Sequence, residues 1–116
     1  MKQVVYVDHV PFLSGAELAL CGLLARLDRS RWQPTVILGA PGPLEERLRR
    51  DGVPVEVLPM PSTLMGRRPL QRSAFLNPLR DASGMAYVVR LAARLRGRAD
   101  LVHANSLRAC VLAAAL

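Results

Sequence analysis

Hydrophobic positions along the chain follow two spacings in turn, and these predict alternating strands and helices. Short apolar or β-branched runs at 3–8, 34–39, 53–58 and 101–103 predict four strands. After the first run, leucines recur at helical spacing and predict a helix over about 15–28. Strands that alternate with helices indicate a parallel sheet with right-handed crossovers, covered by helices on both faces.

Local signals place the ends of two further helices. Pro43 suits a first helical turn, and Gly52 is a typical stop signal after such a helix. Glu45 and Arg49 are four residues apart, so they can form a stabilising pair on its surface. A later apolar pattern predicts another helix that ends near Gly97.

The third predicted strand carries Pro54 and Glu56, which indicate an edge position in the sheet. Together the elements predict an α/β fold, a Rossmann-like parallel sheet with helices on both faces. The sequence ends inside an apolar helical stretch at 113–116. We therefore expect residues 1–116 to be the front part of a longer protein, cut within a helix.

The segment 60–80 interrupts the alternation of strands and helices. Its prolines exclude long helices, while apolar residues are interleaved with arginines. An irregular apolar and basic insert of this length in a compact domain is usually functional or mobile.

Composition narrows the class of protein. The chain has 116 residues, 51% of them hydrophobic, which is typical of a single globular domain. Its formal net charge is +7, and all but one of its 16 basic residues are arginines. Arginine enrichment reflects either phosphate or membrane contacts or the codon bias of a GC-rich genome. The few aromatic residues are not interleaved with the arginines, which argues against a nucleic-acid stacking platform.

The two cysteines, Cys21 and Cys110, are far apart in the sequence and lack the spacing of a metal or redox pair. We expect free buried thiols in a reducing compartment. No signal peptide is evident, and no apolar run approaches the roughly 20 residues that span a bilayer. These features predict a cytoplasmic protein.

Two polar segments follow predicted strands and carry the candidate chemistry. Ser14 and Gly15 stand where the first strand gives way to a helix, and residues 100–106 surround the fourth strand. The first N–H groups of a helix lack partners and lie at its positive end, so they bind phosphates well. Since ligands bind beyond the carboxyl ends of parallel strands, the two segments predict a shared ligand crevice.

Each candidate residue has a structural alternative. His9 follows the first strand and could reach the crevice, although ordinary loop polarity also explains it. His103 could hydrogen-bond a ligand in the crevice as a neutral imidazole, or it could be a packed core residue. Gly15 either contacts a ligand or permits a sharp turn. A dipole role in the first helical turn is favoured for Glu17, and Asn105 is expected to cap the last helix.

Arg90 and Arg94 lie four residues apart, and Arg98 follows just beyond the helix. Like charges at this spacing destabilise a helix slightly, so an anionic neighbour is expected. With the apolar and basic loop at 64–76, these arginines could rest on an anionic membrane surface. A solvated arginine face is the alternative.

Four motifs occur in order along the chain: Ser-Gly-Ala-Glu-Leu at 14–18, Gly-Pro-Leu at 42–44, Gly-Val-Pro-Val at 52–55 and Asp-Leu-Val-His-Ala-Asn-Ser at 100–106. Together they resemble the N-terminal domain of retaining GT-B glycosyltransferases, the family 4-like group. The resemblance covers nearly the whole chain apart from the insert.

The resemblance implies two Rossmann-like domains that face each other across a cleft, with the C-terminal domain holding most of the nucleotide-sugar donor. Ser14 and Gly15 would approach the donor diphosphate and the acceptor, and His103 would project into the cleft near the transferred sugar. His9 and Asn105 are further substrate candidates. This chain has Ser14 where many relatives have glycine, and Asn105 where many have a second histidine.

The resemblance implies transfer of a sugar to a hydroxyl of a glycan or lipid-linked acceptor, with retention and without a metal ion or other cofactor. Residues 1–116 alone would be inactive, because the donor-binding domain would be missing. A place at the inner face of the membrane, as a peripheral protein, would fit a lipid-linked acceptor. The alternative is a non-catalytic Rossmann-like module that binds a nucleotide or a protein, and a second α/β domain encoded downstream would decide against it. A nucleic-acid binder is the weakest interpretation.

Overall fold

The structure is a computed structural model, and it describes residues 2–9, 12–60 and 82–105 of the chain. Strands and helices alternate along the described sequence, as the apolar spacing predicts. The elements are β1 (Lys2–Asp8), α1 (Gly15–Arg26), β2 (Trp32–Leu38), α2 (Pro43–Arg50), β3 (Val55–Val57), α5 (Ala82–Leu95) and β4 (Leu101–Ala104).

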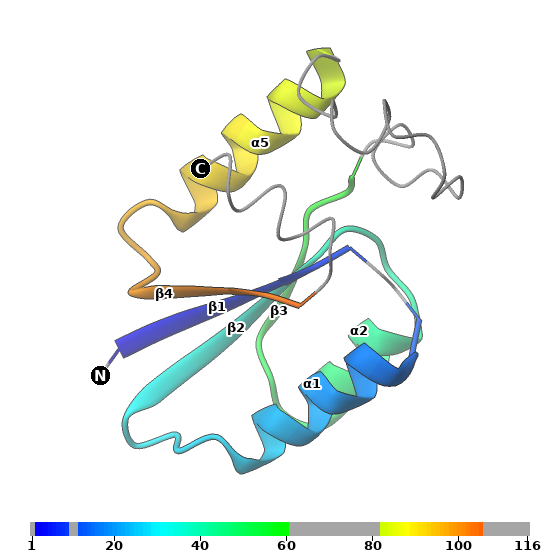
Figure 1. The fold of residues 1–116 in the computed structure, drawn as a ribbon, viewed down its shortest axis with the longest axis vertical. Coiled ribbons are helices and arrows are strands. Elements are labelled where there is room, and N and C mark those ends of the chain that lie inside the picture. Colours follow the sequence, from blue (N-terminus) through cyan, green and yellow to red (C-terminus); the bar gives the residue numbers. More distant parts are fainter. Residues whose placement is uncertain (1, 10–11, 61–81, 106–116) are drawn as a thin grey trace.

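The four strands form one sheet in the order β3-β2-β1-β4, and every neighbouring pair is parallel. Helices α1 and α2 lie on one face of this sheet and α5 lies on the other (Figure 1). The α/β, Rossmann-like fold is thereby confirmed. Among the described strands, β3 lies at one edge of the sheet, as Pro54 and Glu56 predict, and β4 lies at the other edge.

Side chains from the two faces of the sheet build two hydrophobic cores, because neighbouring residues of a strand point to opposite faces. Among the described residues, the core beneath α1 and α2 contains Val4, Tyr6, Leu20, Cys21, Leu24, Val36, Leu38, Leu44, Leu48 and Val53. The core beneath α5 contains Val5, Val7, Ile37, Leu58, Met60, Tyr87, Val88, Leu91 and Leu95. Both faces of β1 are therefore covered, which explains its continuous apolar run.

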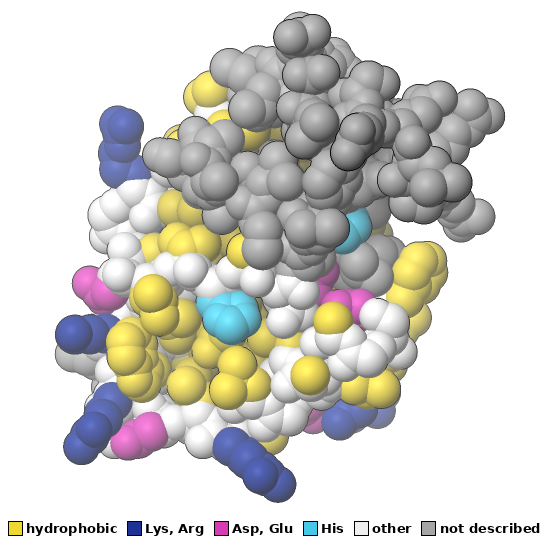
Figure 2. Space-filling view, in the orientation of Figure 1, with side chains coloured by type: hydrophobic (Ala, Val, Ile, Leu, Met, Phe, Trp, Pro, Cys, Tyr) yellow, Lys and Arg dark blue, Asp and Glu magenta, His cyan; other side chains and the backbone are white. Residues whose placement is uncertain are grey.

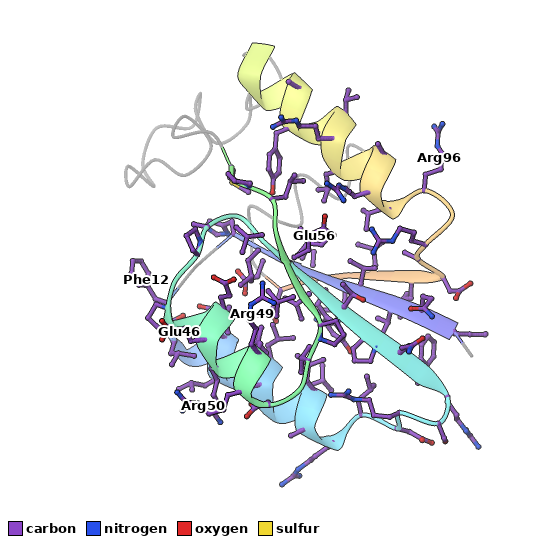
Figure 3. The ribbon with its side chains drawn as sticks, turned by 180° about the vertical axis from the view of Figure 1, so that it is seen from behind. Phe12, Glu46, Arg49, Arg50, Glu56 and Arg96 are labelled. Carbon is purple, nitrogen blue, oxygen red and sulfur yellow. The ribbon has the colours of Figure 1, made fainter. Side chains whose placement is uncertain are left out.

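The predicted helix ends are confirmed. Gly52 follows α2 with φ 79° and Gly97 follows α5 with φ 74°, a backbone conformation that glycine adopts without steric cost. On the surface of α2, the Arg49 guanidinium lies 2.9 Å from the Glu45 carboxylate, so the predicted pair forms (Figure 3).

Tyr87 fixes α5 to the chain that leaves β3. Its ring is buried in the core, and its hydroxyl donates a hydrogen bond of 3.1 Å to the Leu58 carbonyl. Burial disfavours the phenolate and raises the pKa of Tyr87 to about 12. The hydroxyl thus remains a donor throughout the physiological pH range.

The carboxyl ends of β1 and β2 approach closely at Gly39. A side chain there would come within 3.3 Å of both the His9 Cα and the Met60 Cβ. The Gly39 N–H donates to the Asp8 carbonyl, and the Gly39 carbonyl accepts from the Met60 N–H. A residue without a side chain therefore lets three segments meet at this end of the sheet.

Some expectations lie outside the described residues. They include most of the 60–80 insert, the last helix and Cys110. Cys21 is buried and free, as expected, and burial raises the pKa of its thiol. In the part of the chain that the structure describes, no helix has the length and apolar character needed to cross a bilayer.

Candidate functional site

The candidate site lies where β1 and β4 end and α1 begins. These strands are parallel neighbours, so their carboxyl ends reach the same edge of the sheet. The Asn105 N–H donates a hydrogen bond of 2.9 Å to the Val7 carbonyl and extends the pairing just past β4. The two polar segments predicted to share a crevice are thus adjacent.

Two carboxyl groups are buried at this edge. Asp8 and Glu17 are each only 1% exposed, a burial that is costly for a carboxyl group without hydrogen-bond partners. The Asn105 side-chain amide donates to the Asp8 carboxylate at 2.8 Å and to the Ala16 carbonyl at 3.3 Å. The Ser14 hydroxyl donates to the Glu17 carboxylate. We call Asp8, Ser14, Glu17 and Asn105 the carboxyl-end network.

Glu17 holds its proton more tightly than an exposed glutamate. Burial is the main cause of its raised pKa, and the charge of Asp8 and a hydrogen bond with Asp8 raise it further. The hydrogen bond from Ser14 acts in the opposite direction, because it stabilises the carboxylate. Glu17 and Asp8 therefore form an interacting pair of carboxyl groups.

Ser14 and Gly15 are exposed on the outer side of this network. Ser14 is the N-cap of α1, and its carbonyl accepts the first intrahelical bond, 2.9 Å from the Leu18 nitrogen. A Cβ added at Gly15 would meet no atom of the described residues within 4 Å, and Gly15 does not have positive φ. Among the described residues, neither a packing contact nor a positive φ requires glycine at this position.

The two histidines lie on or directly after the strands that end at this edge. His9 directly follows β1 and is half-buried. His103 lies on β4 opposite Tyr6, with its side chain exposed and its ring centroid 5.1 Å from that of Tyr6. The chain's two histidines are both visible on the face shown in Figure 2. His103 thus reaches solvent on the α1 side of an edge strand, and its role in the cleft stays a prediction.

Sequence reasoning missed the pairing of Asp8 with Glu17. The signal available was a Ser-x-x-Glu spacing at the start of α1, which is typical of a capping box. The structure shows no side-chain cap at Ser14, because its hydroxyl bonds the Glu17 side chain instead. Asn105, expected to cap the next helix, donates to Asp8 and Ala16. Ser14 and Asn105 thus both belong to this network.

A second polar cluster lies between β3 and α5. The carboxylate of Glu56, which Figure 3 labels, is 2.7 Å from the Arg94 guanidinium and 3.7 Å from that of Arg98. We call these three residues the Glu56 cluster. The anionic neighbour expected for the arginines is, for two of them, a carboxylate of the protein itself. Membrane contact stays a prediction, and the loop at 64–76 lies outside the described residues.

The described residues contain no group of three or more His, Cys, Asp or Glu side chains that could hold a metal ion. The anion-binding features at this edge are instead backbone groups. The N–H groups of Gly15, Ala16 and Glu17 precede the first intrahelical bond of α1, at the positive end of its dipole. Together with the open space at Gly15, they form a surface suited to a phosphate.

Three solved structures of Anabaena HepE share this fold. The complex with UDP and glucose has 24% sequence identity to this chain and a TM-score of 0.67. The complex with UDP-glucose has 24% identity and a TM-score of 0.68, and the complex with UDP has 25% identity and a TM-score of 0.66. Each covers 99% of this chain, whereas this chain covers 26% of HepE. The chain therefore spans about a quarter of the length of these proteins, consistent with an incomplete half of a GT-B fold.

A comparison with curated proteins finds no match. The sequence model of the glycosyl transferase 4-like domain, by contrast, matches residues 14–116, which include the start of α1 and β4. The match extends over most of the chain, and the fold it implies is the one observed. The chain therefore belongs to the glycosyl transferase 4-like domain family.

Proposed function

We propose that the chain is the N-terminal, acceptor-side domain of a glycosyltransferase that uses a nucleotide-sugar donor. The observation that carries the proposal is the start of α1, where the N–H groups of residues 15–17 precede the first intrahelical bond and Gly15 is exposed. Membership of the glycosyl transferase 4-like family supports it, as does the fold shared with structures that contain UDP or UDP-glucose.

In the proposed reaction, an oxygen of an acceptor hydroxyl bonds to the anomeric carbon of the donor sugar. The bond from that carbon to the diphosphate breaks, the diphosphate takes the electron pair, and the hydroxyl loses its proton. The N–H groups at the start of α1 stabilise the negative charge that develops on the diphosphate. Retention of configuration, the absence of a metal requirement and a glycan or lipid-linked acceptor are parts of the proposal.

In this proposal, the backbone comes close to the diphosphate or the acceptor at Gly15, beside Ser14. His103 lies on β4, from which its neutral imidazole would hydrogen-bond a hydroxyl of the transferred sugar. His9 borders the same edge as a substrate contact. In these assignments, the turn at the start of α1 binds the anion, and polar side chains that follow β1 or lie on β4 contact the sugar or the acceptor.

The two glycines of α1 provide a matched test. A Cβ meets no described atom within 4 Å at either Gly15 or Gly22, and both residues are exposed. Alanine favours a helix by up to about 1 kcal/mol over glycine, so neither Gly15→Ala nor Gly22→Ala should destabilise the protein. The complete protein encoded by the gene is assayed for UDP or GDP release from a panel of sugar nucleotides, beside residues 1–116 alone.

We expect activity in the complete protein only. Gly15→Ala should lower the rate about tenfold or more, because the added methyl group displaces the ligand from the N–H groups. Gly22→Ala should leave the rate unchanged, and His103→Ala should lower it. Equal rates in the two glycine variants would remove Gly15 from the site. Binding of UDP by the complete protein without transfer of any sugar would favour the non-catalytic binding module instead.

A further inference from the structure

We propose that the carboxyl-end network is a positioning device, which holds the Ser14–Gly15 turn and the first N–H groups of α1 in the orientation that the diphosphate requires. This inference rests on the proposed function. Asp8, Glu17 and Asn105 are then positioning residues, since they act through the turn without touching the substrate.

The contacts of Asn105 tie three elements together at one point. Its backbone N–H donates to Val7 of β1, and its side-chain amide donates both to Asp8 and to the Ala16 carbonyl in the first turn of α1. The beginning of α1 is thereby joined to the ends of β1 and β4. A hydrogen bond is directional, so these contacts fix orientation as well as distance.

The buried side chains of α1 differ between its first turn and the rest of the helix. Farther along the helix the buried residues are Leu20, Cys21 and Leu24, which attach it to the sheet by apolar contact. Only the first turn buries a carboxyl group, Glu17, against a second one. Apolar side chains of similar volume would stabilise a helix as well or better. The polar arrangement is therefore confined to the part of the helix that directs N–H groups outward.

The hydrogen bonds of the network have a defined direction. A hydrogen bond between two carboxyl groups requires a proton on one of them, and burial together with the charge of Asp8 favours the proton on Glu17 by raising its pKa. Ser14 donates to Glu17 and Asn105 donates to Asp8, and a protonated Glu17 would donate to Asp8. In the described residues, the titratable groups that act on Glu17 or respond to its charge are Asp8 from β1 and Cys21 from α1.

Loss of the proton from Glu17 would place two negative charges side by side in a buried position. Repulsion between them would displace the first turn of α1 and with it the N–H groups. The positioning role therefore predicts that the transfer rate falls as pH rises through the titration of Glu17. The ordinary glutamate value of 4.5 is the lower limit of that range, because burial and Asp8 raise the pKa.

Two substitutions at one position separate hydrogen bonding from volume. Glu17→Gln keeps an acceptor for Ser14 and a donor for Asp8 but has no proton to lose, whereas Glu17→Leu keeps the volume and removes both hydrogen bonds. Glu46→Gln, at an exposed site in the first turn of α2, is the control for the loss of a carboxylate. The complete protein is used, and two quantities are measured: amide hydrogen exchange of residues 15–18 and the rate of sugar transfer against pH.

We expect Glu17→Gln to lie within about twofold of wild type in both quantities at acidic pH, and to lack the fall in rate at higher pH. In Glu17→Leu, the amides of residues 15–18 should exchange about tenfold faster, because buried partners lose their hydrogen bonds. For the same reason, the rate of sugar transfer should be about tenfold lower. Glu46→Gln should keep the wild-type profile. If Glu17 had a purely structural role, the pH profile of the transfer rate would be the same in Glu17→Gln and wild type.

Equal amide exchange in Glu17→Leu and Glu17→Gln would overturn the positioning role. A pH profile that is the same in Glu17→Gln and wild type would also overturn it. If the wild-type protein neither binds UDP nor transfers a sugar from any donor, the proposed function fails, and hydrogen exchange alone still decides whether the network fixes the turn.

Discussion

The carboxyl-end network and the Glu56 cluster both contain carboxylates with polar partners, but they differ in how far these side chains are buried. In the first, Asp8 and Glu17 are 1% exposed and are held by hydrogen bonds from Asn105 and Ser14. In the second, one carboxylate faces two arginines whose side chains are 53% and 56% exposed. Water competes for every charge in the second cluster but is excluded from the carboxyl groups of the first.

This difference sets the expected energies. A buried polar group that loses its partner costs about 1–3 kcal/mol, since water cannot replace the lost hydrogen bond. A surface ion pair contributes about 0–1 kcal/mol, because solvent screens it and two long side chains lose freedom. The network at the carboxyl ends of the strands should therefore determine local structure, whereas the Glu56 cluster should adjust it only slightly.

The largest expected effect comes from removing Asp8. Asp8→Ala leaves the Asn105 amide and Glu17 without their shared acceptor, so the free energy of unfolding should fall by about 2 kcal/mol. Glu56→Ala, in the other cluster, should cost no more than about 1 kcal/mol. Urea unfolding followed by circular dichroism measures both. Similar losses in the two variants would show that the clusters do not differ in the way their burial indicates.

The fold and the network were not equally predictable from the sequence. Apolar spacing gave the four strands and the described helices within a few residues, because burial acts on neighbouring positions in a regular way. The Asn105 side chain, by contrast, meets Asp8 across 97 residues of sequence. Such a contact follows from strand order, which the spacing of apolar residues along the chain does not specify.

The polar residues of the two clusters show what the sequence leaves open about the partners of a side chain. Ser14 and Glu17 have the spacing of a capping box, and the sequence does not show that Asp8 lies close enough to change the arrangement. Arg94 and Arg98 prompted the expectation of an anionic neighbour, and Glu56 is that neighbour. In both cases the residue type was informative, whereas the partner depended on which strand lies next to which helix.

The second prediction concerns the pH dependence of stability. The folded protein holds the Glu17 proton more tightly than the unfolded chain, since burial and Asp8 raise the pKa. This contribution to stability is complete below the unfolded value, near 4.5, and is lost as pH rises through the folded value. Glu17→Gln does not titrate, so its stability relative to wild type should increase with pH across that range.

Thermal unfolding of wild type and Glu17→Gln at a series of pH values measures this difference. Glu46→Gln should run parallel to wild type, because the Glu46 side chain is exposed at the start of α2. A constant difference between Glu17→Gln and wild type at every pH would mean that the folded and unfolded states bind the Glu17 proton equally. The two carboxyl groups would then not form the interacting pair described above.

The smallest expected effect is that of Glu56→Gln, and it tests the other side of the comparison. The substitution keeps the size of the side chain but removes its attraction for Arg94 and Arg98, which lie 2.7 and 3.7 Å away. The loss should stay below about 1 kcal/mol at low salt and should largely vanish at 1 M NaCl, where charges are screened within about 3 Å. Urea unfolding at both salt concentrations measures the loss, and Glu17→Leu, whose effect arises from buried hydrogen bonds, should show little dependence on salt. A loss of 2 kcal/mol that persists at 1 M NaCl would instead place Glu56 in the same category as Asp8, a carboxylate on which the arrangement of neighbouring elements depends.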